Sequence, residues 1–195
     1  MNIVALILAR SGSVRLKNKH LKALGTKKLI EWTFELSNNK YLKISDFVLS
    51  TDDSKILNLS KNYPIISFGL RPAYLAKSET SSYQAAKHII KIYEKKIDKI
   101  DIIILLQPTS PFRNIRKINQ SIDLFVNLKH KINIISVIKK NNSSKFNGNF
   151  YITSKNILFK EKTFVTKNFI PISLNTKYSI DIDTIKDLNI AKREL

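Results

Sequence analysis

The feature that most constrains the fold is the alternation of short apolar runs with amphipathic stretches along the chain. The first run, Ile3–Ala9, is almost continuously apolar, as expected for a strand covered on both faces of a sheet. The stretch 115–128 instead spaces its apolar residues three and four positions apart, which is typical of a helix with one buried face. This alternation is typical of β-α-β units and predicts a three-layer α/β domain with a mainly parallel sheet.

The expected elements follow from the same pattern. Strands are expected at 3–9, 46–50, 65–68, 101–106 and 132–138, and helices at 28–37, 81 to about 93, 115–128 and 184–192. Asp52 is expected to cap the helix after the second strand, and Ser81 with Gln84 forms a capping-box pattern. Residues 141–149 are predicted to be a polar turn, and 150–153 with 156–159 a hairpin.

Ligands of open α/β sheets bind beyond the carboxyl ends of the strands. That rule directs attention to four places: the loop after Ala9, the residues after Ser50, those after Leu106 and those before Thr184.

Composition limits the function classes. The 195 residues suit one domain, 1–195, and 34 Lys and Arg against 15 Asp and Glu give a formal net charge of +19. The basic residues are dispersed along a chain that is also rich in Asn and Ile, which indicates a general compositional bias. A positive field of this kind still attracts nucleotides and acidic sugars. The charge also suggests a nucleic-acid-binding module, but without a basic-aromatic cluster we expect no nucleic acid partner. The absence of cysteine excludes disulfides and thiolate chemistry. No apolar run can span a bilayer, and Ile3–Ala9 lacks the basic leader of a signal peptide, so we expect a cytoplasmic protein without a membrane partner.

The loop after Ala9 has the composition of a phosphate site. Its small residues 11–13 allow backbone N–H groups to converge on an anion, and four cations lie close by: Arg10, Arg15, Lys17 and Lys19. The spacing matches neither a Walker loop nor a dinucleotide fingerprint. A solvated basic turn is the alternative interpretation.

Asp181 and Asp183 lie two positions apart in an apolar, extended segment, so their side chains share one face. A divalent cation relieves the repulsion between two such carboxylates, and oxygen ligands favour Mg²⁺. The alternative is a helix cap at Asp183 or Thr184, which leaves Asp181 unexplained. Gln107 ends a buried strand, where its amide can donate and accept hydrogen bonds to a sugar, or it is an ordinary strand end.

Six segments, in order, resemble the acylneuraminate cytidylyltransferases, the enzymes that activate sialic acids. They are 7–13 with Lys19, 49–53, 70–76, 80–82, 105–113 and 179–184. The resemblance implies a Rossmann-like nucleotidyltransferase of the nucleotide-diphospho-sugar transferase type. It also implies the reaction, in which CTP and an acidic nine-carbon sugar give a CMP-sugar and pyrophosphate.

The resemblance also implies site residues. Those expected to bind CTP are Arg10, Ser11, Gly12, Ser13, Lys19, Arg71, Thr80 and Ser82. Gln107 and Lys145 are expected to contact the substrate, and Asp181 and Asp183 to hold Mg²⁺. The catalytic groups are expected to be Arg10, Lys19, Asp181 and Asp183.

The chain departs from the family's pattern in three places. His20 stands where the family usually has Asn, and Lys145 where it has a phosphate-binding Arg. The family's insertion that supplies a phosphate-binding Lys and dimer contacts is largely missing near 139–146. A homodimer is therefore left open. The candidates to replace the phosphate-binding Lys are Lys139, Lys140 and Lys145. The alternatives are therefore a shortened paralogue that binds CTP or a CMP-sugar without turnover, or an enzyme for another acidic sugar such as pseudaminate, legionaminate or a Kdo-like acid.

Overall fold

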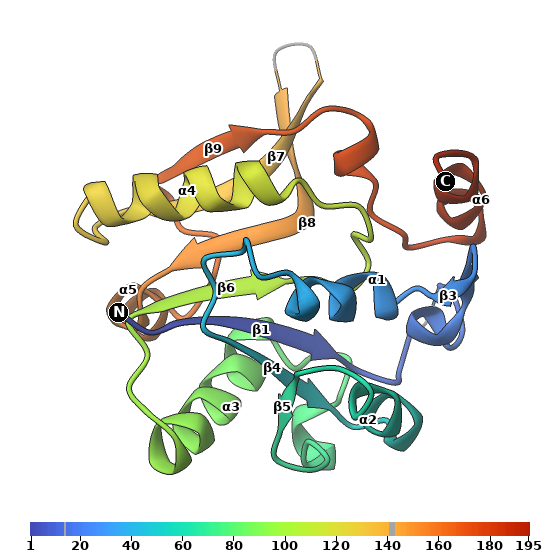
Figure 1. Cartoon of the computed structure of the whole chain (residues 1–195), viewed down its shortest axis with the longest axis horizontal. Coiled ribbons are helices and arrows are strands. Elements are labelled where there is room, and N and C mark those ends of the chain that lie inside the picture. Colours follow the sequence, from blue (N-terminus) through green and yellow to red (C-terminus); the bar gives the residue numbers. More distant parts are fainter. Residues whose placement is uncertain (14, 141–142) are drawn as a thin grey trace.

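The computed structural model describes residues 1–13, 15–140 and 143–195. Its main sheet has the strand order β5-β4-β1-β6-β8-β7-β9 (Figure 1). The strands are β1 Ile3–Ala9, β4 Asp46–Thr51, β5 Ile66–Ser67, β6 Ile102–Leu106, β7 Asn133–Lys140, β8 Ser143–Thr153 and β9 Phe169–Ser173. β1 pairs in parallel with β4 and β6, and β8 alone runs antiparallel to both of its neighbours. The mainly parallel α/β sheet predicted from the sequence is confirmed.

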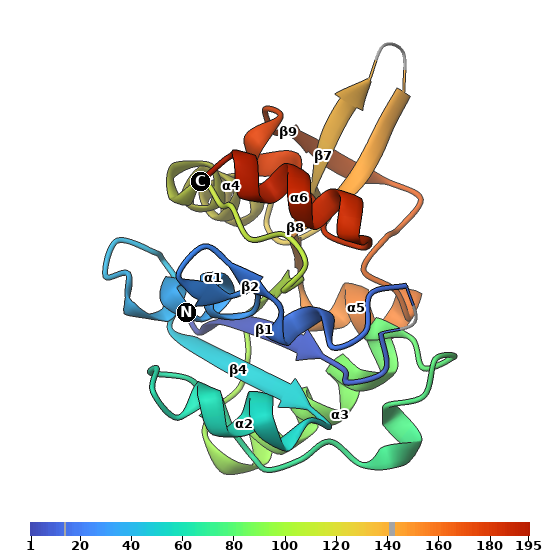
Figure 2. The same ribbon diagram turned by 90° about the vertical axis from the view of Figure 1, so that its right-hand side faces the viewer.

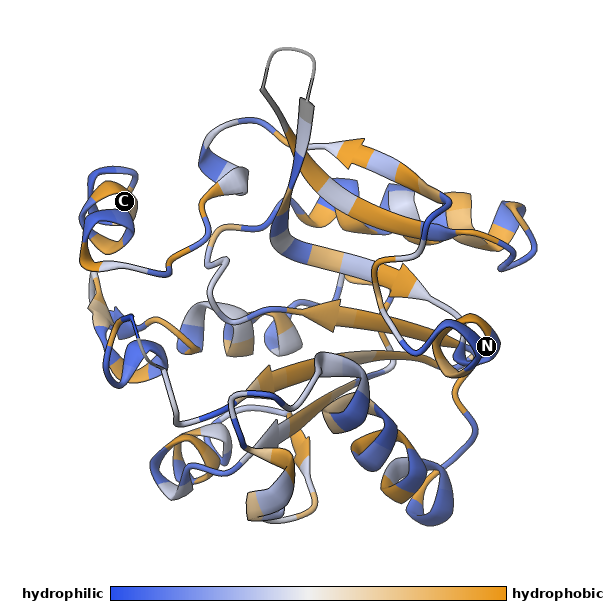
Figure 3. Cartoon of the chain, turned by 180° about the vertical axis from the view of Figure 1, so that it is seen from behind, coloured by the Kyte–Doolittle hydropathy of each residue, from blue (hydrophilic) through white to orange (hydrophobic). Residues whose placement is uncertain are grey.

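Helices cover both faces of this sheet. They are α1 Glu31–Phe34, α2 Ser54–Ser60, α3 Ser82–Lys96, α4 Ile115–Asn127, α5 Lys155–Glu161 and α6 Ile185–Arg193. Ala5 and Ile7 of β1 pack in one cluster with residues of α1 and α4, whereas Val4 and Leu6 pack in a second cluster with α3 and α5. Apolar residues therefore concentrate on the strands and polar residues on the outer sides of the helices (Figure 3).

A third, smaller cluster fixes the C-terminal segment. The short strands β2 Ala23–Leu24 and β3 Lys27–Lys28 form a hairpin against which α6 packs (Figure 2). Ile182 is fully buried in this cluster with Leu24 and Leu188, and its N–H donates to the Thr109 carbonyl at 2.8 Å. Because neighbouring side chains of an extended segment point to opposite sides, burial of Ile182 directs Asp181 and Asp183 away from this core.

The capping box predicted for Ser81 and Gln84 is confirmed at the start of α3. Thr184 caps α6 in a capping box with Asp187, which agrees with the alternative interpretation of that segment as a helix cap. The helix expected at 28–37 begins later, at Glu31, because Lys27 and Lys28 pair with β2. Among the described residues, no helix has both the length and the apolar character needed to cross a membrane.

The expectation that Asp52 caps α2 is wrong. Asp53 is the N-cap, and its carboxylate accepts from the N–H groups of Lys55 and Ile56 at 2.8 and 3.4 Å. Asp52 instead turns back to the first loop, where it accepts from the backbone N–H of Ser11 at 2.9 Å. Two adjacent carboxylates therefore have separate structural tasks.

The predicted turn at 141–149 is also wrong for its described part, because residues 143–153 form the single strand β8; residues 141 and 142 lie outside the description. Asn147 and Asn149 are buried and hydrogen-bonded to other parts of the chain, so their polarity did not indicate exposure. Residues 151–153 pair with β6, and 151 and 152 also pair with β7. Ser154 caps helix α5, where the second strand of a hairpin was expected. The edge strand β9 was not predicted; Pro171 lies in its middle.

Candidate functional site

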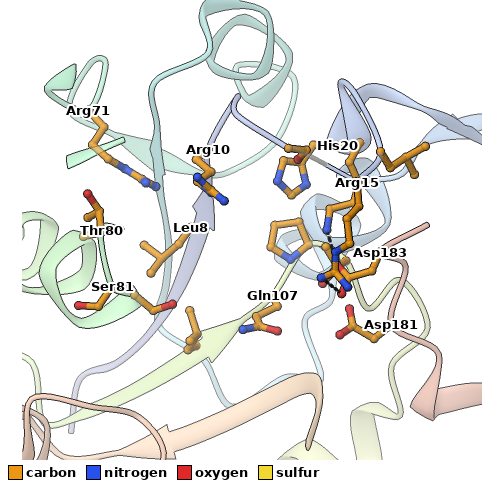
Figure 4. A pocket seen from close by; sticks show the side chains of 18 residues that line it. Leu8, Arg10, Arg15, His20, Arg71, Thr80, Ser81, Gln107, Asp181 and Asp183 are labelled. Atoms are coloured by element: carbon orange, nitrogen blue, oxygen red, sulfur yellow. Dashed lines mark hydrogen bonds and ion pairs between the residues drawn. The ribbon is translucent and has the colours of Figure 1, made fainter. Parts of the chain in front are cut away.

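A cavity of about 410 Å³ lies beyond the carboxyl ends of β1 and β6 (Figure 4). Three of the four places expected from the sequence contribute to its lining: the loop after β1, the turn after β6 and the segment before α6. The predicted residues that line it are Arg10, Ser13, Lys19, Arg71, Thr80, Ser82, Gln107, Asp181 and Asp183. The residues after Ser50 contribute indirectly, because Asp52 holds the first loop through Ser11.

Arg71 is fixed at one side of the cavity. Its Nε donates to the Ser50 hydroxyl at 2.9 Å, a second guanidinium nitrogen donates to the Ser50 carbonyl, and its backbone N–H donates to the Thr51 carbonyl at 2.7 Å. The side chain is buried, and this burial lowers the pKa of the guanidinium. In the described parts of the chain this buried guanidinium is hydrogen-bonded to neutral groups only, which favours an electron-rich ligand group in front of it.

The two aspartates on the opposite side differ in their partners. Lys19 donates to one oxygen of Asp183 at 2.7 Å, and Arg15 pairs with the other. Oδ1 of Asp181 is buried and has no hydrogen-bond partner among the described residues. Burial raises the pKa of Asp181, Thr109 opposes that change, and the charge of Asp183 adds to it. The site therefore contains a carboxylate oxygen that is stabilised poorly without a further cation or proton.

These features fit a divalent cation. No group of three His, Asp or Glu side chains that could hold a metal occurs in the described ranges, so the protein would offer only the two aspartates. Mg²⁺ is commonly bound by one or two carboxylates, with water and substrate phosphates completing its coordination. The unpartnered oxygen of Asp181 matches that donor set, whereas Asp183 would contribute an oxygen that is paired with Lys19 or Arg15 in this structure.

Gln107 lies at the bottom of the cavity, in the turn after β6. Its carbonyl accepts from the Arg113 guanidinium at 2.7 Å and from the Ser110 N–H at 3.1 Å, so its backbone is held from two sides. The side chain lines both the main cavity and an adjoining one of about 170 Å³. Its amide can therefore reach a ligand in either space.

Arg113 was not selected from the sequence as a site residue, although the fold gives it a clear task. Besides Gln107, its guanidinium donates to the Thr33 hydroxyl at 2.9 Å and to the Asn149 carbonyl at 3.2 Å. Burial lowers its pKa, and the charge of Asp181 opposes this. It links α1, β8 and the turn after β6, and that turn carries Gln107. In the sequence, Arg113 is the last residue of the segment 105–113, one of the six that resemble the family.

His20 lines the cavity in place of the family's usual Asn. The side chain is 7% exposed, and its Nδ1 has no hydrogen-bond partner within the described parts of the chain. Burial, reinforced by the charge of Lys19, lowers its pKa to about 4. The imidazole is therefore neutral at physiological pH, and it presents one donor and one acceptor nitrogen.

Three predicted residues lie outside the described lining. Ser11 and Gly12 are exposed, and the Ser11 hydroxyl donates to Asp52. Lys145 is exposed on β8, where it pairs with Ile138. The side chains of Lys139 and Lys140 fall outside the described residues. Arg15, which the sequence offered only as one cation of the loop, does line the cavity. The roles of these residues and the cytoplasmic location remain predictions, and the homodimer remains open.

Comparison with known proteins agrees with this geometry. The chain is 28% identical to an N-acylneuraminate cytidylyltransferase of Escherichia coli over 221 aligned positions, which cover 97% of this chain and 51% of the relative. The chain thus spans about half the length of that relative. It is 26% identical to a CMP-N,N'-diacetyllegionaminic acid synthase of Legionella pneumophila, with 99% of this chain and 96% of the relative covered.

A solved structure of CMP:2-keto-3-deoxy-manno-octonic acid synthetase complexed with CTP superposes with a TM-score of 0.76 at 14% identity. The superposition covers 99% of this chain and 98% of that one, which shows that the two share a fold. A family model described as Cytidylyltransferase matches residues 4–192. With nearly the whole chain matched, and with the matched segments meeting around one cavity, this protein belongs to the cytidylyltransferase family.

Proposed function

We propose that this protein transfers a cytidylyl group from CTP to the anomeric hydroxyl of a nonulosonic, sialic-acid-like sugar and releases pyrophosphate. The observation that carries the proposal is the arrangement of charge around one cavity. Arg10 and Arg71 lie on one side, the two aspartates on the other, and Gln107 between them (Figure 4). Such a site can hold a polyphosphate, a divalent cation and a polar acceptor together.

The residues have distinct tasks in this reaction. Arg10 and Lys19 line the cavity, and their charge supports a role in binding the phosphates. Arg71, Thr80 and Ser82 also line the cavity, and we assign them to the cytosine. The similarity to proteins named for N-acylneuraminate and diacetyllegionaminic acid supports an acidic nine-carbon acceptor.

In the reaction, the anomeric oxygen forms a bond to the α-phosphorus, and its proton passes to solvent. The bond between the α-phosphorus and the bridging oxygen breaks, and pyrophosphate leaves with the electron pair. Arg10 and Lys19 would balance the charge of the phosphates, while Gln107 would orient the acceptor. Asp181 and Asp183 would hold Mg²⁺, which supplies further neutralisation of the phosphate charge when bound.

The test is pyrophosphate release from CTP and Mg²⁺ with N-acetylneuraminate, legionaminate, pseudaminate or a Kdo-like acid. Asp181→Asn keeps the size of the side chain and removes a carboxylate from the cavity, so we expect release to be abolished. Asp123→Asn is the matched control, because Asp123 is about half exposed and pairs with Lys43 on the outer surface. Melting temperatures of both variants show whether each one folds.

Release with one sugar, lost in Asp181→Asn and kept in Asp123→Asn, would support the proposal and name the acceptor. CTP binding without release from any sugar would refute transfer and favour a binding paralogue. Equal rates for the two variants would refute the assignment of Asp181.

A further inference from the structure

The polar stretch 147–150 forms a bulge in β8. Tyr151 pairs with Ile135 of β7, but Phe146 pairs with Val137, so residues 147–150 stand opposite the single residue Ser136. A bulge of this kind bends a strand and redirects its residues. This bulge, called the 147–150 bulge below, lies where β8 passes the end of β6, since the Gln107 N–H donates to the Gly148 carbonyl at 3.3 Å.

Buried hydrogen bonds fix the 147–150 bulge in place. The Ser136 hydroxyl donates to the Asn147 side chain at 2.7 Å and accepts from the Phe150 N–H at 2.9 Å. The Asn149 amide donates to the carbonyls of Phe112 and Tyr178 at 2.7 and 2.9 Å. The bulge is therefore tied to the turn after β6 and to the segment that leads to Asp181. Buried side-chain hydrogen bonds of this kind hold a single backbone geometry.

Gly148 is the point at which the bulge touches the site. Its φ is +70°, a left-handed conformation that favours glycine. A Cβ added there would lie 2.3 Å from Oε1 of Gln107 and 2.9 Å from the Ser110 hydroxyl oxygen. The side-chain amide of Gln107 therefore rests directly against the Gly148 backbone. Any side chain at 148 would take the space that this amide occupies.

We infer that Gly148 is a positioning residue, which sets the Gln107 amide at the junction of the two cavities and so controls how the acceptor binds. The inference rests on the proposed function, in which Gln107 contacts the acceptor sugar. The groups assigned to CTP belong to the loop after β1 and to the region of Arg71 and α3. A displaced Gln107 should therefore impair use of the acceptor and leave CTP binding intact.

The experiment compares Gly148→Ala with Gly69→Ala. Gly69 also has a positive φ, +91°, but a Cβ there meets nothing within 4 Å, so this control has backbone strain without a collision. For Gly148→Ala we expect kcat/KM for the acceptor to fall about 10-fold to 100-fold, because a hydrogen bond to a polar substrate is misplaced. The Kd for CTP should change less than about twofold. Gly69→Ala should keep both values.

A double-mutant cycle with Gln107→Ala shows whether Gly148 acts through Gln107. We expect Gly148→Ala to have no further effect on kcat/KM once the amide is gone, and the double variant to melt at a higher temperature than Gly148→Ala alone. Additive losses of kcat/KM, or an unchanged kcat/KM in Gly148→Ala, would overturn the inference. If Gly148→Ala folds too poorly for kinetics, the melting temperatures test the inference instead. The double variant must then be more stable than Gly148→Ala, because the amide that collides with the added Cβ is absent.

The two proposals can fail separately. Absence of turnover in the unaltered protein with every sugar would refute the proposed function alone. The Gln107 side-chain amide signal in NMR spectra, assigned with Gln107→Ala, would still report on positioning. It should shift in Gly148→Ala and stay in place in Gly69→Ala, and an unchanged signal in both would refute the role of Gly148.

Discussion

Replacement of His20 by Asn should make the stability of this protein less sensitive to acid. The imidazole is 7% exposed, and burial and the charge of Lys19 lower its pKa from 6.5 to about 4. The folded protein therefore keeps His20 neutral under conditions in which the unfolded chain binds a proton there. As the pH falls below about 6.5, that proton favours unfolding, and the loss continues until the pH reaches about 4.

The size of the effect follows from the two pKa values. At about pH 5 the unfolded His20 is almost fully protonated and the folded one is mostly neutral, which costs about 2 kcal/mol of stability relative to pH 7. For a chain of this length, such a loss corresponds to a fall in Tm of about 4–8 °C. His20→Asn has no group that titrates in this range, so its stability should lack this contribution.

The assay is urea unfolding of both proteins at about pH 7 and pH 5. The compared quantity is the change in the free energy of unfolding between the two pH values, because the altered packing of Asn cancels in that difference. His130→Asn is the control, since His130 is half-exposed, stacks on Phe125 and has a positive φ that Asn accepts. If His20→Asn and the unaltered protein lose the same free energy, the assigned burial of a neutral imidazole is wrong.

Two further predictions separate local structure from the site. Asp52→Ala should weaken CTP binding about tenfold or more at little cost in stability, because Asp52 holds the Ser11 backbone of the cationic loop. Asp53→Ala should lower the free energy of unfolding by about 1 kcal/mol by uncapping α2, and it should keep CTP binding. Calorimetric titration with CTP and urea unfolding measure both effects, and equal CTP affinities in the two variants would refute these separate roles. Thr184→Ala should lower the free energy of unfolding by about 1 kcal/mol through loss of the α6 capping box, measured by urea unfolding, and an unchanged value would contradict the cap.

The parts of the fold that the sequence predicted are those set by local pattern. The continuous apolar run predicts the strand Ile3–Ala9, and the spacing of Ser81 and Gln84 predicts the capping box of α3. Predictions failed where distant partners decide the outcome. Asn147 and Asn149 are polar residues of a kind that indicates a turn, yet both are buried. The Ser136 hydroxyl donates to the Asn147 side chain, and the Asn149 amide donates to two backbone carbonyls. Asp52 and Asp53 cannot be told apart as caps without knowing that the Ser11 loop lies beside Asp52.

The acidic pair shows the same division within the site. Its geometry is local, because Ile182 must enter the core and its two neighbours must then point the other way. Its electrostatics are not local: the cations that neutralise Asp183 lie 168 and 164 positions earlier, at Arg15 and Lys19. Sequence spacing alone makes the two aspartates equivalent ligands for a cation. The fold makes them unequal, since Asp183 has two cationic partners and Asp181 keeps a buried oxygen without one among the described residues. The free energy available from a bound cation should therefore come mainly from Asp181, which is why Asp181→Asn, rather than Asp183→Asn, is the informative variant.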